Sequence, residues 1–137
     1  MLVPKKRIMF LCINNSCRSQ MAEGIAKTLK GDEYEVFSAG MEPTHVNPRA
    51  IEVLKEIGID ISSQYSKLIE NHLLNSMDIV VTLCGEAEEA CPVTPPHIKR
   101  EHWPLPDPAR ATGTEEEIMD KFREVRNKII ELVKEKL

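Results

Sequence analysis

Aromatic residues are scarce in this sequence, and long hydrophobic runs are absent. Aromatic side chains make up 4% of the 137 residues, so the core has to be built mainly from aliphatic side chains. The charged segment Met1–Arg7 leads into an apolar run from Ile8 that is too short for a signal peptide and far too short to span a membrane. We therefore expect a cytoplasmic protein that does not act at a membrane.

The chain also lacks a basic stripe, internal repeats and low-complexity linkers. Its formal net charge is −4, which argues against a general nucleic-acid binder. A length of 137 residues suits one hydrophobic core, so residues 1–137 are expected to form a single domain. We expect this domain to be a monomer.

Predicted strands alternate with predicted helices along the chain. The expected strands are 8–11, 34–39, 78–83 and 99–103. The expected helices are 19–30, one that begins at Asn47-Pro48, a short one after Ser62 or Ser63, a turn around 69–74, and a last one that begins at the capping box 114–117. This order predicts an α/β fold, with one parallel four-stranded sheet covered by helices on both faces.

The helical periodicity also predicts which side chains are buried. The expected buried stripes are Met21, Ala22, Ile25 and Leu29 in the first helix, Ala50, Val53, Leu54 and Ile57 in the second, with Gly58 as its C-terminal glycine, and Ile118, Phe122, Val125, Ile129, Leu132 and Val133 in the last.

The loop Cys12–Ser19 lies between the first strand and the first helix, and it has the features of an oxyanion site. Backbone N–H groups of such a loop point inward, and the start of a helix adds partial positive charge. Arg18 can bind two oxygens of a tetrahedral anion, and the same surroundings favour the thiolate form of Cys12, to which Ser19 can donate a hydrogen bond. The predicted anion-binding residues are Ile13, Asn14, Asn15, Ser16, Cys17 and Arg18.

The sequence of this loop has two other interpretations. One is a buried cysteine that ends a strand, followed by an arginine on a solvated turn. The other is a nucleotide phosphate-binding loop, which is excluded because the segment contains no glycine and no Gly-Lys-Ser/Thr ending.

Cys84 and Cys91 flank a segment of alanine and glutamate residues that favour a helix. Positions seven apart in a helix are separated by about 10.5 Å along its axis, whereas a disulfide needs Cα atoms within about 7 Å. A Cys84–Cys91 bond therefore requires this segment to unwind, which would make it a redox switch open to a thioredoxin-type dithiol. The alternatives are two inert thiols or half of a zinc site, but neither this spacing nor His97 and His102 fits the usual zinc pattern, so no metal ligand is assigned.

The loop resembles the signature of low-molecular-weight protein tyrosine phosphatases and of the arsenate reductases built on that fold. With the later cysteines included, nearly the whole chain looks like the thioredoxin-coupled arsenate reductases. The segments that carry the resemblance are 12–19, 19–24, Ser38-Ala39-Gly40, Val46-Asn47-Pro48, 80–84, Cys91-Pro92, His102-Trp103 and Asp107-Pro108.

The resemblance implies a three-cysteine relay. Cys12 attacks arsenate, Cys84 attacks Cys12 and releases arsenite, and Cys91 then attacks Cys84 to leave a Cys84–Cys91 disulfide that thioredoxin reduces. No tightly bound cofactor is implied, and arsenate and thioredoxin are the expected partners. Asp107 is the expected general acid, although a turn residue before proline is the other interpretation of it. Cys17 has no step in the relay and is expected to pack or to support the backbone.

Two positions depart from the family pattern. Asn14 stands where glycine is common, and asparagine tolerates the left-handed backbone that such a glycine adopts. Some members bind potassium through residues that match Asn15, Glu23 and Ser38 together with an acid, but Lys67 occupies the acid's position here. We hypothesise that the ammonium group replaces the ion, or that the ion site is lost.

Two functions from other classes remain open. A phosphatase would use Cys12, Arg18 and Asp107, but Ala109 follows Asp107-Pro108 where those enzymes have a tyrosine, and the other thiols would be idle. A redox sensor without catalysis would use only the Cys84/Cys91 switch.

Overall fold

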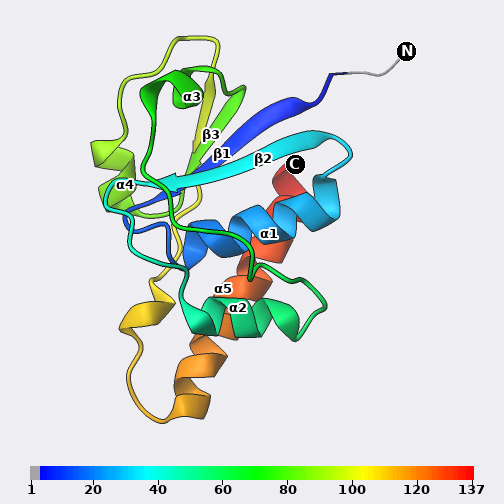
Figure 1. Ribbon diagram of the computed structural model, residues 1–137, viewed down its shortest axis with the longest axis vertical. Coiled ribbons are helices and arrows are strands. Elements are labelled where there is room, and N and C mark those ends of the chain that lie inside the picture. The colour runs from blue at the N-terminus through cyan, green and yellow to red at the C-terminus, as the bar shows by residue number, and fades with distance from the viewer. Residues whose placement is uncertain (1–3) are drawn as a thin grey trace.

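Four parallel strands form one sheet in the computed structural model, which describes residues 4–137 (Figure 1). The strands are β1 (Lys6–Cys12), β2 (Tyr34–Gly40), β3 (Ile79–Thr82) and β4 (Lys99–His102), in the order β2-β1-β3-β4. Each neighbouring pair is parallel, so the predicted α/β class and four-stranded parallel sheet are confirmed. Met1, Leu2 and Val3, which open the segment considered as a signal peptide, lie outside the described residues.

Helices cover both faces of this sheet (Figure 1). The helices are α1 (Arg18–Lys30), α2 (Pro48–Lys55), α3 (Asn71–Asn75), α4 (Gly85–Ala90) and α5 (Glu115–Lys136), with a 3-10 turn at Pro108–Arg110. Side chains of α1, α2 and α5 pack in one cluster with Ile8 and Phe10, whereas α3 and α4 pack on the other side with Met9 and Leu11. These four residues of β1 are fully buried, as expected for a central strand that is apolar throughout.

Two helix starts follow the local rules that the sequence displays. Asn47 caps α2, its side chain accepting a hydrogen bond from the backbone N–H of Arg49, and Pro48 occupies the first helical position. Thr114 and Glu117 form the predicted capping box of α5. Gly58 has a φ of +81° and reverses the chain after α2, as predicted for a C-terminal glycine.

Three predictions about packing and local structure were wrong. No helix begins after Ser62 or Ser63, because that stretch forms a turn and then runs extended along the loop, where Lys67 donates a backbone hydrogen bond to Asn15. Leu29 and Ile57 are each 41% exposed instead of buried. For Ile57 the reason is that α2 ends at Lys55, and the reversal at Gly58 turns Ile61 into the core in its place.

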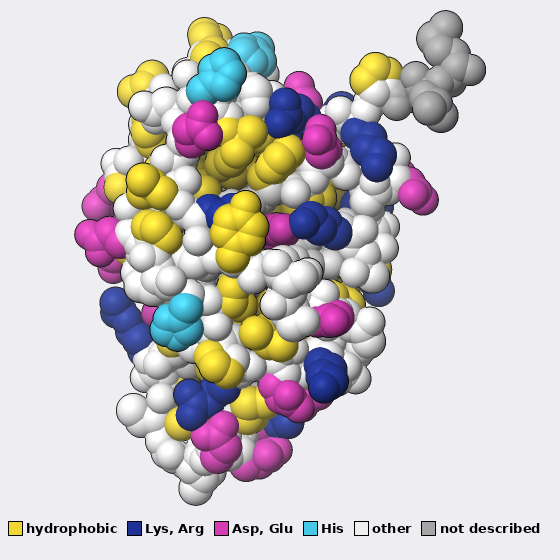
Figure 2. All heavy atoms as spheres, in the orientation of Figure 1, with side chains coloured by type: hydrophobic (Ala, Val, Ile, Leu, Met, Phe, Trp, Pro, Cys, Tyr) yellow, Lys and Arg dark blue, Asp and Glu magenta, His cyan; other side chains and the backbone are white. Residues whose placement is uncertain are grey.

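The surface and the helices agree with two features of the sequence. In Figure 2, basic and acidic side chains are interspersed over the visible face and do not gather into one basic stripe. Among residues 4–137 there is no helix with the length and apolar composition that crossing a membrane requires.

Gly40, the last residue of β2, lies directly against the loop that follows β1. A Cβ atom at this position would stand 2.6 Å from the carbonyl oxygen of Ile13 and 2.8 Å from the backbone nitrogen of Asn15. Both neighbours are backbone atoms, which cannot move aside as a side chain can. The absence of a side chain at Gly40 therefore fixes how closely the loop packs on the sheet.

We expect Gly40→Ala to destabilise the protein by about 1–3 kcal/mol, because the added methyl group overpacks a rigid contact. Urea unfolding followed by circular dichroism measures this change. Gly85→Ala is the matched control, since a Cβ atom there meets nothing within 4 Å. Equal stability of the Gly40→Ala variant and the wild type would contradict the proposed contact.

Candidate active site

Cys12 ends β1 and is 3% exposed, with its Sγ 2.9 Å from the hydroxyl oxygen of Ser19. The same hydroxyl oxygen accepts a hydrogen bond of 2.7 Å from the side-chain amide of Asn15. Because that bond uses a lone pair of Ser19, its hydroxyl hydrogen is available to the sulfur. The contact between Ser19 and Cys12 that the sequence suggested is therefore present, and its geometry suits a thiolate acceptor.

The carbonyl groups of the loop point away from its centre. The carbonyl oxygen of Ile13 accepts from the backbone N–H of Glu42 at 2.8 Å, and that of Ser16 accepts from Asn47 at 3.0 Å. In a trans peptide the N–H group points opposite to the carbonyl group. Holding the carbonyls outward therefore turns N–H groups inward, at the start of α1, where an anion is favoured.

Asn15 holds this loop in shape. It is fully buried, and it has a φ of 48°, the only positive φ of a non-glycine residue in the described part of the chain. Its side-chain oxygen accepts from the backbone N–H of Lys67 at 2.9 Å and from the side chain of Gln20 at 3.0 Å. The left-handed residue is thus Asn15 and not Asn14, which corrects the expectation from the sequence.

Gln20 is a structural residue of the site that sequence reasoning missed. It is fully buried in the first turn of α1, and it donates to the backbone oxygen of Asn15 and to that of Tyr65. Gln64 in turn donates to the side chain of Gln20 at 2.7 Å. The sequence signal that could have identified Gln20 is a polar residue next to the apolar positions of the predicted helix.

Arg18 and Asp107 face each other across the mouth of the loop. A guanidinium nitrogen of Arg18 lies 3.7 Å from a carboxylate oxygen of Asp107, and another donates to the carbonyl oxygen of Leu105 at 3.1 Å. Asp107 also accepts from the backbone N–H of Ala109 at 3.0 Å. Asp107 is therefore a turn residue as well as a carboxylate that lines the site, and its role as general acid stays a prediction.

Two adjoining hollows bring the predicted residues together. Cys12 lines one of them and Cys84 lines the other. Asn14, Arg18 and Asp107 border both hollows, so the two thiols open onto one continuous polar site. The site lies at the carboxyl ends of β1 and β3, beyond which α1 and α4 begin (Figure 1).

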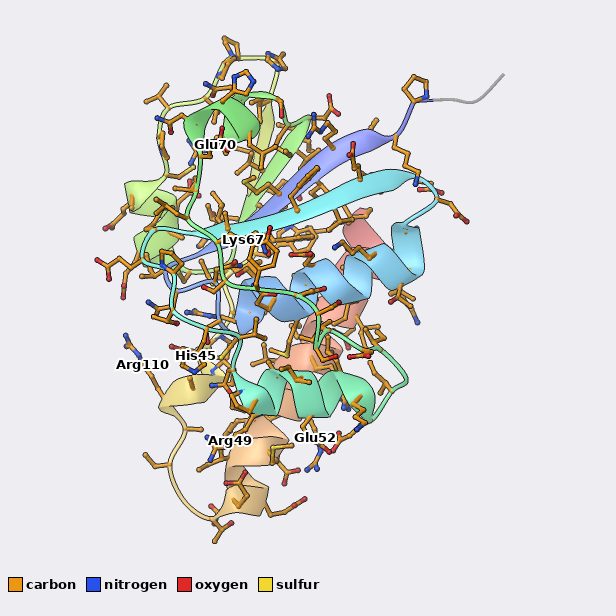
Figure 3. The ribbon with its side chains drawn as sticks, in the orientation of Figure 1. His45, Arg49, Glu52, Lys67, Glu70 and Arg110 are labelled. Carbon is orange, nitrogen blue, oxygen red and sulfur yellow. The ribbon has the colours of Figure 1, made fainter. Side chains whose placement is uncertain are left out.

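Arg110 is a second arginine at this site. Its Nε lies 3.6 Å from the carboxylate of Asp107, and its side chain is 78% exposed. Figure 3 shows Arg110 at the outer edge of the molecule. An exposed cation there contributes positive charge at the mouth of the hollow that contains Cys84.

The segment between Cys84 and Cys91 is the helix α4, as predicted. Cys84 caps its start, and the sulfur accepts from the backbone N–H of Ala87 at 3.4 Å. Cys91 follows its end, is 9% exposed, and packs on the face of the sheet that α3 and α4 cover. Burial raises the pKa of the Cys91 thiol. All four cysteines are free, so this is the geometry of the reduced protein.

Cys17 differs chemically from the other cysteines of the site. It is 5% exposed, and burial together with the nearby charge of Asp107 raises the pKa of its thiol to about 12. A thiol with this pKa stays neutral near neutral pH and is a poor nucleophile. Its packing in the core cluster fits the supporting role that the sequence suggested.

The ammonium group of Lys67, which is labelled in Figure 3, reaches the buried carboxylate of Glu23. Its Nζ is 3.6 Å from the Oε1 atom of Glu23, whose side chain is 6% exposed and also accepts from Ser38 and Lys27. Burial lowers the pKa of Lys67, and the carboxylate of Glu23 opposes that shift. The ammonium group therefore stands beside Glu23, one of the residues that match the potassium ligands, and Ser38 donates to the same carboxylate oxygen, which supports replacement of the ion.

The chain matches the family model of low molecular weight phosphotyrosine protein phosphatases over residues 7–137. A curated arsenate reductase of Bacillus subtilis (strain 168) is 58% identical over 130 residues, which cover 95% of this chain and 94% of the relative. A solved arsenate reductase in the phosphate binding state is 41% identical, with a TM-score of 0.78 and coverage of 95% of both chains.

A second solved relative is a thioredoxin-dependent arsenate reductase of Corynebacterium glutamicum. It is 28% identical, with a TM-score of 0.75, over 98% of this chain and 63% of that chain. The similarity to these relatives extends over nearly all of the chain.

We expect the free energy of unfolding to be the same in potassium and sodium salts at equal ionic strength, because Lys67 already supplies the positive charge beside Glu23. In Lys67→Ala the protein should lose about 1–3 kcal/mol, since a carboxylate oxygen of a buried acid loses a charged partner. Urea unfolding in the two salts measures both quantities. A gain in stability of the wild type that is specific for potassium would contradict replacement of the ion.

Proposed function

This chain belongs to the low molecular weight phosphotyrosine protein phosphatase family, and we propose that it is an arsenate reductase that uses Cys12, Cys84 and Cys91 in sequence and is regenerated by thioredoxin. The observation that carries this proposal is the placement of Cys84 on a hollow that adjoins the one lined by Cys12. A phosphatase has no use for a second thiol there, whereas a reductase requires one.

The first step is capture of arsenate by the loop. Arsenate is a tetrahedral anion like phosphate, and the solved relative in the phosphate binding state supports a site for a tetrahedral anion in this fold. Inward N–H groups and the guanidinium of Arg18 bind its oxygens. The thiolate of Cys12, stabilised by Ser19, attacks arsenic and forms a bond between sulfur and arsenic.

Loss of an oxygen from arsenic needs a proton. Asp107 borders the loop hollow, so its carboxyl group is placed to donate this proton. The carboxyl group then protonates the departing hydroxide, which leaves as water. The product is a covalent adduct of Cys12 with arsenic still in the +5 state.

The second thiol performs the reduction. The thiolate of Cys84 attacks the sulfur of Cys12, and the electron pair of the bond between sulfur and arsenic goes to arsenic. Arsenic becomes As(III) and leaves as arsenite, and the two sulfurs become the Cys12–Cys84 disulfide. The hydrogen bond from Ala87 to Cys84 stabilises negative charge on the attacking sulfur.

The third thiol, Cys91, releases Cys12 in the loop of residues 12–19, here called the anion loop. The thiolate of Cys91 attacks the sulfur of Cys84, and Cys12 leaves as a thiolate that is ready for another arsenate. Because positions at the two ends of α4 are about 10.5 Å apart along the axis, α4 has to unwind for this bond to form. The unwound segment exposes the Cys84–Cys91 disulfide to the dithiol of thioredoxin, which supplies two electrons and two protons.

We expect arsenate-dependent consumption of NADPH when the protein is mixed with thioredoxin, thioredoxin reductase and arsenate. The wild type should give a steady rate that disappears without arsenate, and Cys84→Ser should abolish it because no second thiol reduces arsenic. Cys17→Ala is the matched control and should retain the rate, since the Cys17 thiol is buried and neutral. No rate, but release of phosphate from an aryl phosphate that Cys84→Ser leaves intact, would assign the protein to the phosphatases.

We expect Cys91→Ser to release at most one arsenite for each protein molecule, because Cys12 stays trapped in the Cys12–Cys84 disulfide. Quantifying arsenite in a single mixing experiment, with mass spectrometry of the disulfide-linked peptides, checks this result. Sustained turnover of the variant with thioredoxin would rule out the third step.

A further inference from the structure

Arg100 lies at the end of α4 that is far from the anion site, and the relay as described assigns it no role. One guanidinium nitrogen donates to the carbonyl oxygen of Pro92 at 3.3 Å, and another lies 3.9 Å from a carboxylate oxygen of Glu88. Its Nε is buried and has no hydrogen-bond partner within residues 4–137. Pro92 directly follows Cys91, so this hydrogen bond attaches Arg100 to the chain next to the third thiol.

Glu88 is held from two sides. The hydroxyl group of Thr82, which is fully buried in β3, donates to the same Oε2 atom that faces Arg100. The hydroxyl oxygen of Thr82 also lies 2.9 Å from the Nδ1 atom of His102, which is a further titratable group of this cluster. These contacts tie the helical form of α4 to the edge between β3 and β4.

Cys91 reacts as a thiolate, yet it is 9% exposed and its burial disfavours a charge. Burial raises the pKa of Cys91, the nearby Arg100 lowers it, and the nearby Glu88 raises it. Arg100 is thus the group that offsets the cost of forming a thiolate, and Glu88 neutralises part of its charge while α4 is helical.

We propose that Arg100 is the positioning residue of the third thiol, Cys91. Arg100 anchors the chain at Pro92 and supplies the positive charge beside which the Cys91 thiolate forms. Glu88 neutralises part of that charge until α4 unwinds. This inference rests on the proposed function, because it gives a role to a residue in the Cys91 step. Unwinding of α4 moves Glu88 away from Thr82 and Arg100, so the full charge becomes available when Cys91 attacks.

The step is balanced without any added reactant. The Cys91 thiol gives its proton to solvent, and its sulfur forms a bond with the sulfur of Cys84. The Cys12–Cys84 bond breaks, and both of its electrons stay on Cys12 as a thiolate. Arg100 remains protonated throughout and acts only through its charge and its hydrogen bond.

The test is the pH dependence of Cys91 alkylation by iodoacetamide in the reduced protein, without arsenate or thioredoxin. Peptide mass spectrometry separates Cys91 from the other thiols, and the midpoint of the rate against pH reports its pKa. Arg100→Gln should raise the midpoint by about half to one pH unit, which slows alkylation roughly three- to tenfold below the midpoint. Arg100→Lys should keep the wild-type midpoint, and Glu88→Gln should lower it.

Lys99→Gln is the matched control. It removes a positive charge from the neighbouring position of β4, where the side chain pairs with Glu101 at 3.2 Å, and it should leave the midpoint unchanged. If Arg100 only tethers the segment, Arg100→Gln would expose Cys91, speed alkylation at every pH and lower the midpoint, because burial is what raises the pKa of this thiol. That result, or an equal shift in Lys99→Gln, would overturn the proposal.

A second readout separates this inference from the proposed function. With arsenate, Arg100→Gln should release the first arsenite at the wild-type rate but slow the steady rate with thioredoxin, because only the Cys91 step is impaired. If the wild type forms no arsenite, the proposed function fails while the alkylation midpoints still decide the role of Arg100. If arsenite forms normally and the midpoint does not move, only the role of Arg100 fails.

Discussion

The hydrogen bonds of the buried Asn15 side chain are the interaction on which the candidate active site depends. They join three segments that are distant in the sequence: the anion loop, the first turn of α1 and the extended stretch around Lys67. Because Asn15 adopts a left-handed conformation, its amide reaches Ser19, and Ser19 then reaches Cys12. The orientation of the attacking sulfur therefore follows from one residue whose backbone conformation is unfavourable for most side chains.

Burial sorts the four thiols into different chemical roles. Cys17 is enclosed beside a carboxylate and is kept neutral, whereas Cys12 faces a hydroxyl donor and an arginine-lined hollow. Cys84 receives a backbone hydrogen bond at the start of α4, and Cys91 is enclosed at its end with Arg100 beside it. The same functional group, a thiol, thus either packs in the core or acts as a nucleophile, depending on the charges and hydrogen-bond donors around it.

Helix α4 keeps the Cys84 and Cys91 thiols apart by its own length, and this separation sets the order in which they react in the proposed relay. While α4 is helical, Cys84 opens onto the site, whereas Cys91 is buried at the other end of α4, in the core between α4 and the sheet. Contacts of Glu88 with Thr82 and Arg100 stabilise this arrangement. Any disulfide between the ends of α4 has to break them, so redox chemistry and local unfolding are linked in one short segment.

The sequence alone was sufficient for features that depend on neighbours along the chain. The capping box at Thr114, the cap at Asn47, the helical character of 85–90 and the loop with Cys12 and Arg18 depend on residues a few positions apart. The parallel order of strands and helices then placed Cys12, Cys84 and Asp107 at one end of the sheet, as found.

Tertiary structure alone decided the features that depend on partners far away in the chain. Lys67 and Ser66 bond to the anion loop, so the stretch after Ser63 runs extended instead of forming the predicted helix. The left-handed residue is Asn15 because its side chain finds donors from α1 and from Lys67, which no local pattern reveals. The contacts of Arg100 with Glu88 and Pro92 likewise exist only because β4 packs beside β3 and α4. Residue propensities and motif spacings act between residues that are close in the sequence. These contacts join residues that are distant in the sequence, and they form only when the strands and helices pack together around the site.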